Sequence, residues 1–167
     1  FCTLADLLGS SRRLIRVMPN TPSLVLAGAA AFSINPKATS QDSEVAQALF
    51  SAVGSCVEVP ESQLDAVTGL SGSGPGYVFT FIEAMIDAGV LAGLPRPVAE
   101  QLVLQTVYGS AKLALESGEH PAVLKGKVTS PGGTTIAGIQ ILEKGAMRGM
   151  VMAAVEAATQ RSRELGA

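Results

Sequence analysis

The sequence predicts an α+β fold in which the end of an α/β sheet is followed by an all-α helical bundle. Residues 1–60 contain short apolar, partly β-branched runs that are separated by proline and glycine turns. From residue 61 onward, apolar residues recur at the three- and four-residue spacing of helices. We therefore expect two parts, residues 1–60 and residues 61–167, within a length that allows one large domain or two small ones.

Three strands are expected in the first part. The apolar runs at 13–20 and 24–34 predict two strands, which are ended by the prolines of MPNTP and by Asn35-Pro36. The alternating segment SCVEVP at 55–60 predicts a third, short strand.

One helix is expected over residues 41–53, because Val45, Leu49 and Val53 recur at positions i, i+4 and i+8. Thr39 or Ser40 is the expected N-cap, and Gly54 is the expected end of the helix. Strand, helix and strand in this order are typical of the last elements of an α/β sheet.

The second part is expected to be helical throughout. The predicted helices cover 62–69, 76–92, 96–116 and 121–126, then run from the 128–138 motif to about 144, and end with 146–165. They are apolar nearly all round, which is typical of helices buried on more than one side. Gly89 and Gly109 lie inside helices, where glycine costs up to ~1 kcal/mol relative to alanine, and close helix contact would explain them. We expect a bundle that interlocks with a second copy of itself, and a compact monomeric bundle is the alternative.

The composition excludes several classes of protein. The chain is 47% hydrophobic and 16% charged, against about 25% charged residues in typical soluble domains, so we expect either an oligomer or a missing partner domain. The net charge is -2 and the chain contains no tryptophan, and both observations argue against nucleic-acid binding. No apolar run approaches the ~20 residues of a membrane span.

The cysteines and the histidine suggest no metal site and no catalytic triad. Cys2 and Cys56 are far apart and form no CxxC motif, which indicates a reducing compartment and no zinc site. His120, the only histidine, stands in the turn GEHPAV. We expect it to be a loop or helix-cap residue, because no partners for a general base can be placed near it.

The glycine-rich segment LSGSGPGY at 70–77 does not match a dinucleotide-binding fingerprint. That fingerprint needs G-x-G-x-x-G between a strand and a helix, whereas the third glycine is displaced here and a helical segment precedes it. The segment is either a tight corner between helices that requires glycine, or a loop whose bare backbone approaches a ligand.

The segment RVMPNTP at 16–22 ends a predicted strand in a rigid turn. Ligands of open α/β sheets bind beyond the carboxyl ends of the strands. The Asn20 amide could therefore hydrogen-bond a ligand, and a plain proline turn is an equal alternative.

The motif VTSPGGTTIAG at 128–138 predicts the start of a helix behind a proline and two glycines. A helix N-terminus exposes unpaired N–H groups and a partial positive charge, and bare glycines let an anion come close. Ser130, Thr134 and Thr135 add hydroxyl donors. The motif suits a small carboxylate, and an ordinary Pro-Gly turn with a threonine cap is the alternative.

The segment Pro121–Glu143 (PAVLKGKVTSPGGTTIAGIQILE) resembles the signature of the Δ1-pyrroline-5-carboxylate reductases. RVMPNTP, DAVTGLSGSGPGYVF, AGLPRPVAEQL and AVEAATQRSREL also fall in this family's order, so the resemblance covers nearly the whole chain from Arg13. The family joins an NAD(P)-binding Rossmann domain to a helical dimerisation domain. The resemblance implies an α+β fragment: the C-terminal remnant of the Rossmann domain over 1–60, then the helical-bundle dimerisation and substrate-binding domain over 61–167. The first residue, Phe1 rather than methionine, agrees with this interpretation.

The resemblance implies an NAD(P)H-dependent oxidoreductase of proline biosynthesis. NADPH or NADH would deliver a hydride to the cyclic imine 1-pyrroline-5-carboxylate and give L-proline. We expect a homodimer or higher homo-oligomer, located in the cytoplasm or the mitochondrion. We also expect no activity from this chain alone, because no glycine fingerprint for the dinucleotide is present.

The resemblance also implies the site residues, with no metal among them. The substrate carboxylate would be held by Ser130, Gly132, Gly133 and Thr134. Thr135 would place its hydroxyl at the ring nitrogen and is the expected catalytic residue. Glu61 matches an acidic position on the substrate side, with a solvated loop carboxylate as the alternative. The expected cofactor contacts are Met18, Pro19, Asn20 and Lys127. Gly126 departs from the family pattern, which commonly has an acidic residue there.

Two other interpretations stay open. The absent glycine fingerprint favours a non-catalytic dimerisation module of a truncated reductase. Another member of the 6-phosphogluconate dehydrogenase-like group would typically carry a catalytic lysine on a helix after the Rossmann domain. The absence of lysine between Lys37 and Lys112 counts against that group.

Overall fold

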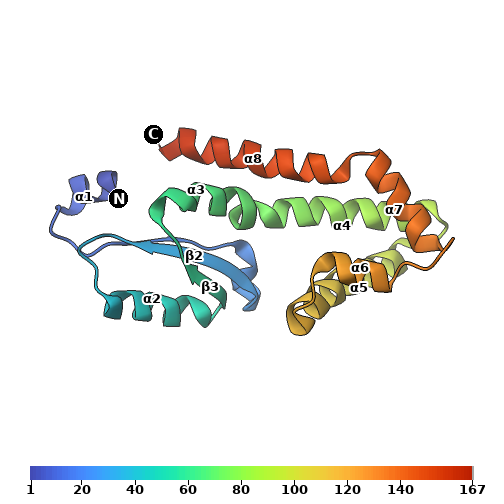
Figure 1. Ribbon diagram of the computed structural model, residues 1–167, viewed down its shortest axis with the longest axis horizontal. Helices are drawn as coiled ribbons and strands as arrows, with labels where there is room; N and C mark the ends of the chain where they lie inside the picture. Colours follow the sequence, from blue (N-terminus) through green and yellow to red (C-terminus); the bar gives the residue numbers. More distant parts are fainter. Residues whose placement is uncertain (167) are drawn as a thin grey trace. The chain divides into compact units, whose positions relative to one another are not determined.

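The strands predicted in the first part form one sheet in the computed structural model, which describes residues 1–166 (Figure 1). β1 (Ile15–Met18) pairs antiparallel with β2 (Gly28–Ile34), and β2 pairs parallel with β3 (Gly54–Glu58). α2 (Ser40–Ser51) joins β2 to β3, so the predicted strand-helix-strand unit is confirmed.

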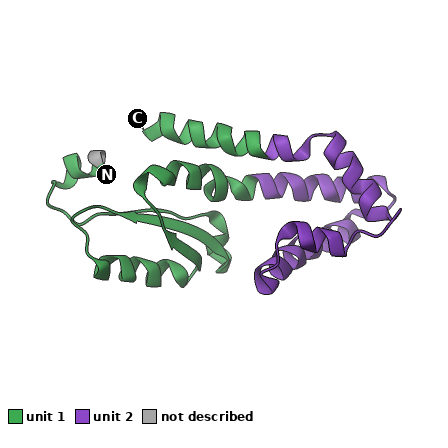
Figure 2. Ribbon diagram, viewed as in Figure 1, with its two compact units in different colours: residues 1–76, 152–167 green, residues 77–151 purple. Residues whose placement is uncertain are grey.

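Two compact units divide the chain (Figure 2). Unit 1 holds residues 1–76, which include the sheet, together with the end of the chain from Met152. Unit 2 holds residues 77–151. No helix in the described part of the chain is both long and apolar enough to cross a membrane.

The core of unit 1 lies between the sheet and α2. Phe32 of β2 is fully buried and packs with Ala30, Ala46 of α2 and Cys56 of β3. The partly buried side chains around this cluster are Ile15, Val17, Ile34 and Phe50. Cys56 is a free thiol, and burial raises its pKa. Ala31 and Ser33, which point to the opposite face of β2, are buried as well, so both faces of this central strand are covered.

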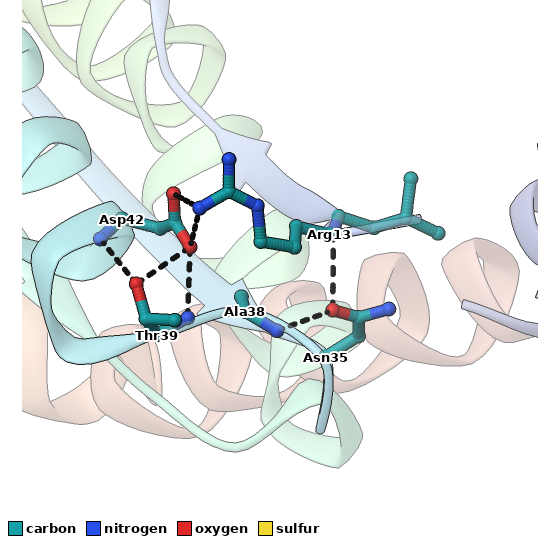
Figure 3. A network of polar contacts seen from close by, with 6 residues as sticks. Arg13, Asn35, Ala38, Thr39 and Asp42 are labelled. Carbon is teal, nitrogen blue, oxygen red and sulfur yellow. Dashed lines mark hydrogen bonds and ion pairs between the residues drawn. The ribbon is translucent and has the colours of Figure 1, made fainter. Parts of the chain in front are cut away.

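Asn35 fastens the end of β2 to the start of β1. Its Oδ1 accepts hydrogen bonds from the N–H groups of Leu14 (3.0 Å) and Ala38 (3.1 Å), and its Nδ2 donates to the carbonyl of Arg12 (2.9 Å). Figure 3 shows this amide beside the start of α2. A buried asparagine with three partners meets the hydrogen-bonding needs of both turns.

A capping box starts α2. Thr39 is the N-cap, as predicted, and its Oγ1 accepts from the N–H of Asp42 while the Asp42 carboxylate accepts from the N–H of Thr39 at 2.8 Å. Arg13 lies 3.1 Å from the same carboxylate (Figure 3). These hydrogen bonds from Thr39, and then the Arg13 charge, lower the pKa of Asp42 below its ordinary value.

The prediction that Gly54 ends α2 is wrong. The C-cap is Ala52, and Gly54 begins β3 with a φ of 149°. A Cβ at position 54 would lie 2.1 Å from the carbonyl oxygen of Gly28, its partner in the sheet. The close approach of the two strands, rather than a helix cap, requires glycine here.

Two other elements differ from the prediction for the first part. The predicted strand at 24–34 begins only at Gly28, because residues Thr21–Val25 form a 3-10 turn (η1) with Pro22 in its first turn. Leu26 then adopts the left-handed conformation with a φ of 59° and ends that turn. α1 (Cys2–Leu8) was not predicted. Proline geometry therefore determines where the second strand can start.

The elements after β3 follow the predicted helices. η2 (Glu61–Gln63), α3 (Leu64–Val67) and the π-helical turn η3 (Thr68–Gly72) come first, and α4 (Gly74–Leu91) follows. The remaining helices are α5 (Arg96–Ser117), α6 (Pro121–Lys127), α7 (Thr134–Lys144) and α8 (Met147–Gly166). The helical content of the second part is thus confirmed.

Within unit 2, a close contact between two helices explains why Gly89 of α4 is a glycine. A Cβ at Gly89 would lie 3.0 Å from the Cβ of Ala99 of α5, which is 1% exposed. This contact confirms the reason expected for Gly89. Gly109 of α5, by contrast, has open space around it among the described residues. Gly93 follows the end of α4 and Gly118 caps the end of α5, each with a positive φ.

Candidate functional site

The loop at 128–133 connects α6 to α7 and carries the predicted cradle. Pro131 precedes Gly132, which adopts a φ of 67° that favours glycine. Gly133 is the N-cap of α7 in an extended conformation, and no side chain caps this helix. The alternative of a threonine cap is therefore wrong, since Thr134 is already the first residue of the helix.

The first turn of α7 presents backbone N–H groups that have no internal acceptor. The N–H of Ala137 donates to the carbonyl of Gly133 at 3.3 Å, which is the first bond of the helix. Within residues 1–166, the N–H groups of Thr134, Thr135 and Ile136 meet no backbone acceptor. Such donors at the positive end of a helix can bind an anion.

The Ser130 hydroxyl lies directly beside this turn. A Cβ at Gly133 would lie 2.3 Å from Ser130 Oγ and 3.2 Å from the Ser130 carbonyl oxygen. The absence of a side chain at Gly133 thus leaves room for the hydroxyl, and the carbonyl of Ser130 accepts from the N–H of Gly133 at 3.1 Å. The structure brings together the predicted residues Ser130, Gly132, Gly133, Thr134 and Thr135.

An open hollow of about 570 Å³ extends along α7 from the two glycines. Its other lining residues include Ile136, Gln140 and Glu143. The sequence analysis missed Gln140 and Glu143, although their spacing of four and seven residues from Ile136 places all three on one helix face. A polar amide and a carboxylate therefore adjoin the glycines of the cradle.

Lys127, a predicted cofactor contact, ends α6. Its Nζ lies 2.6 Å from Oε1 of Glu119, the residue that precedes the N-cap of this helix in the sequence. That N-cap is His120, whose Nδ1 accepts from the N–H of Ala122 at 3.2 Å, so the expected cap role of the histidine is confirmed. A contact between Lys127 and a cofactor stays a prediction.

The predicted cofactor residues of unit 1 stand at the end of β1. Met18 is its last residue and Pro19 is exposed. Asn20 uses its side-chain amide within the chain: Oδ1 accepts from the N–H of Ala29 at 2.9 Å, and Nδ2 donates to the carbonyl of Ser71 at 3.1 Å. The turn is therefore held in place by hydrogen bonds as well as by proline.

Glu61 begins η2, also in unit 1. Its carboxylate accepts from Arg16 Nη1 at 3.4 Å and from the amino group of Phe1, and its side chain is 34% exposed. The predicted residues thus fall into two sets, with Met18–Asn20 and Glu61 in unit 1 and Lys127–Thr135 in unit 2.

The glycines of LSGSGPGY do not form the expected corner between helices that requires glycine. Gly72, Gly74 and Gly76 are helical and absent from the positive-φ residues. A Cβ at Gly72 would lie 2.5 Å from Cε of Met18, so this glycine packs closely against the end of the Met18 side chain. Gly74 has nothing within 4 Å of its Cβ position among the described residues.

No group of three or more histidine, cysteine, aspartate or glutamate side chains in the described part of the chain is placed to hold a metal ion. The described residues offer instead the open N–H groups of α7, the hydroxyl residues of its motif and the carboxylates of Glu61 and Glu143.

Comparison with known proteins finds close relatives. The chain is 58% identical over 153 residues to "Pyrroline-5-carboxylate reductase" of Synechocystis sp., covering 92% of this chain and 57% of that protein. It is 51% identical over 164 residues to the protein of the same name from Methanosarcina acetivorans, covering 98% of this chain and 61% of that protein. The chain therefore spans about three fifths of the length of these relatives.

Solved structures agree with the sequence relatives. The chain superposes on Plasmodium falciparum pyrroline carboxylate reductase with NADP bound, with a TM-score of 0.93, 40% identity and coverage of 100% of this chain and 67% of that one. For a pyrroline-5-carboxylate reductase from Coxiella burnetii the TM-score is 0.94 at 40% identity, covering 97% and 60% of the two chains. The family model described as pyrroline-5-carboxylate reductase dimerisation matches residues 61–165. Because this match covers more than half of its length, the chain belongs to the pyrroline-5-carboxylate reductase dimerisation family.

Proposed function

We propose that this chain forms the substrate-binding and dimerisation part of an NAD(P)H-dependent pyrroline-5-carboxylate reductase, which reduces 1-pyrroline-5-carboxylate to L-proline. The observation that carries the proposal is the anion cradle at the start of α7. The three N–H groups that follow Gly133 meet no backbone acceptor among residues 1–166, and the Ser130 hydroxyl lies beside this turn. The relatives with this name at 51–58% identity support the assignment.

The substrate's carboxylate fits this cradle in charge and size. The N–H groups of the first turn of α7 and the Ser130 hydroxyl donate to it, and the helix dipole favours its negative charge. The Thr135 hydroxyl stands in the same first turn and faces the ring nitrogen in the proposed complex. Glu61 contributes a carboxylate that suits a protonated ring nitrogen.

The chemical step needs few protein groups. A cyclic imine is basic enough to arrive protonated, so positioning supplies most of the rate enhancement. A bound nicotinamide cofactor, NADPH or NADH, supplies the hydride. Met18, Pro19 and Asn20 fit the nicotinamide end, because they form a rigid turn at the end of β1 with Pro19 exposed. Lys127 is the proposed contact for the rest of the cofactor.

We also propose that the chain works as a homodimer or a higher homo-oligomer. Along their described lengths, α4 and α7 contain no buried residue, and Leu91 is 90% exposed. Large apolar side chains are exposed on both helices, among them Phe79 and Ile141, and such exposure is typical of an interface. Light scattering should give a mass of at least two chains of 17.0 kDa. A single-chain mass at micromolar concentration would exclude this arrangement.

The proposed compartment is the cytoplasm or the mitochondrion. The buried free thiol of Cys56 is compatible with either reducing environment.

Calorimetric titration with L-proline tests the cradle directly. The double variant Ser130→Ala, Thr135→Val should weaken binding by at least tenfold, because two hydroxyl hydrogen bonds to charged groups contribute about 1.5–3 kcal/mol each. Thr129→Val is the matched control: its hydroxyl already donates to the carbonyl of Lys125 at 2.6 Å, so its loss should leave the affinity unchanged. Equal affinity in the double variant and the wild type would refute the cradle.

A non-catalytic dimerisation module is the second candidate. Its supporting observation is the sequence itself, which contains no G-x-G-x-x-G, in a chain that spans 57% of its Synechocystis relative. No activity is expected from this chain alone in either case, so the titration with L-proline, combined with the mass measurement, separates the two. An assembled chain that binds neither L-proline nor NADPH would favour the module.

A further inference from the structure

A proline leaves one carbonyl of the helical run 68–76 without its usual donor. In an α-helix the carbonyl of residue i−4 accepts from the N–H of residue i, and proline has no N–H. Pro75 stands four residues after Ser71, so it cannot donate to the Ser71 carbonyl. Here the run forms the π-helical turn η3, in which the N–H of Ser73 donates to the carbonyl of Thr68 at 2.8 Å.

Asn20 supplies a donor to that carbonyl from a distant part of the chain. Its Nδ2 donates to Ser71 O at 3.1 Å, across 51 positions of sequence, and its Oδ1 accepts from the N–H of Ala29 at 2.9 Å. If the amide were flipped, its nitrogen would face the N–H of Ala29 and its oxygen would face the carbonyl of Ser71. These two partners therefore determine the orientation of the side chain. The Met18 side chain packs at Gly72 beside this bond.

We infer that Asn20 is a positioning residue, which fastens the proline-broken turn 68–75 to the end of β1 and thereby shapes the nicotinamide end of the site. This inference rests on the proposed function for its catalytic consequence. Both hydrogen bonds of the amide lie within unit 1. Asn20 therefore acts through Met18, Pro19 and the start of α4 rather than as a direct cofactor ligand.

Asn20→Asp tests the inference with a nearly isosteric change. The carboxylate keeps the bond from Ala29 but sets an oxygen against the Ser71 carbonyl. Hydrogen exchange of the Ser73 and Gly76 amides, which are bonded at 2.8 Å and 3.0 Å in the wild type, should become faster. Adding Pro75→Ala provides an N–H in the place of the missing donor and should restore much of the protection.

The kinetic readout separates positioning from ligand contact. In the reductase that carries this chain, Asn20→Asp should lower kcat about 10- to 100-fold, as for a misplaced reacting group, with little change in the KM for NADPH. Loss of a direct ligand contact would instead raise KM with kcat unchanged. Asn35→Asp is the matched control, because it places a carboxylate oxygen against the Arg12 carbonyl in the same unit. It should lower the stability without this loss of kcat.

The outcomes are distinct. Unchanged exchange at Ser73 and Gly76 in Asn20→Asp overturns the inference, and so does a rise in KM at constant kcat. Faster exchange with unaltered kcat also overturns it, since Asn20 would then be merely structural. If the wild-type reductase that carries this chain reduces no imine, the proposed function fails, and amide exchange with its Pro75→Ala rescue still decides whether Asn20 holds the turn.

Discussion

The two units of this chain differ in how much of their apolar surface they bury on their own. In unit 1, Phe32 is 0% exposed and Leu64 is 1% exposed. In unit 2, Ala99 and Val103 are the only buried residues among those described, while Leu115 is 84% exposed. The comparison shows that the sheet and α2 form a core within one chain, whereas the helices of unit 2 present apolar faces suited to another surface.

The same contrast holds for polar groups. In unit 1, side-chain amides meet backbone groups that secondary structure leaves unpaired, as Asn35 and Asn20 do. In unit 2, the first turn of α7 has N–H groups without internal acceptors among the described residues. The two amides of unit 1 thus find their partners within the unit, where the buried Ser23 hydroxyl alone lacks one among the described residues, and unit 2 carries open donors where a ligand is proposed.

The largest expected effect concerns the core of unit 1. Phe32→Ala should lower the free energy of unfolding by about 3–5 kcal/mol, because a fully buried aromatic side chain is lost. Urea denaturation followed by circular dichroism measures this change.

Leu115→Ala is the contrasting variant from unit 2. At concentrations where the chain is monomeric it should cost less than about 0.5 kcal/mol, and its cost should grow with concentration as the oligomer forms. If Phe32→Ala lowered the free energy of unfolding no more than Leu115→Ala does in the monomer, the proposed difference in burial between the two units would be contradicted.

A pair of glycines in the same segment gives the next effect. A Cβ at Gly69 would lie 2.2 Å from Thr159 Oγ1 and 2.8 Å from the Val155 carbonyl oxygen of α8. Gly69→Ala should therefore destabilise the chain by about 1–3 kcal/mol. Thermal denaturation should show a lower Tm.

Gly74→Ala is the matched control, since a Cβ there meets nothing within 4 Å among the described residues. It should leave stability unchanged or raise it by up to ~1 kcal/mol. Equal losses from the two alanines would show that the contact with α8 does not explain Gly69.

The sequence predicted the elements better than their connections. The spacing of Val45 and Leu49 predicted α2, and Thr39 was correctly expected as its N-cap. Gly54 was misread as a helix end, because the close pairing of β3 with Gly28 is a tertiary contact that no local pattern reveals. The predicted boundary between domains at residue 60 stays a prediction.

For the candidate site, the motif from Ser130 to Thr135 could be predicted, because proline, two glycines and hydroxyl residues define a helix start locally. The partners of Asn20 and Lys127 could not be predicted from the sequence. Ser71 and Glu119 reach these side chains through the fold, at sequence separations of 51 and 8.

A smaller effect is expected at the start of α2. Thr39→Ala removes the N-cap hydroxyl and should cost about 0.5–2 kcal/mol, measured by urea denaturation at pH 7. Thr39→Ser keeps the hydroxyl and should retain most of the stability. An alanine variant as stable as the wild type would show that the capping box contributes nothing to unit 1.

The smallest effect is the pH dependence of the same box. The pKa of Asp42 is lower in the folded chain than its ordinary value of 3.8, chiefly because the backbone N–H of Thr39 donates to the carboxylate. The unfolded chain therefore binds the proton more readily, so the contribution to stability is fully present above that ordinary value. It is lost as the pH falls through the folded pKa. In urea denaturation between pH 7 and pH 3, the stability difference between the wild type and Asp42→Asn should shrink with falling pH. A difference that stayed constant, or grew, would mean that the Asp42 charge does not stabilise the turn between β2 and α2, and that its neutral hydrogen bonds suffice.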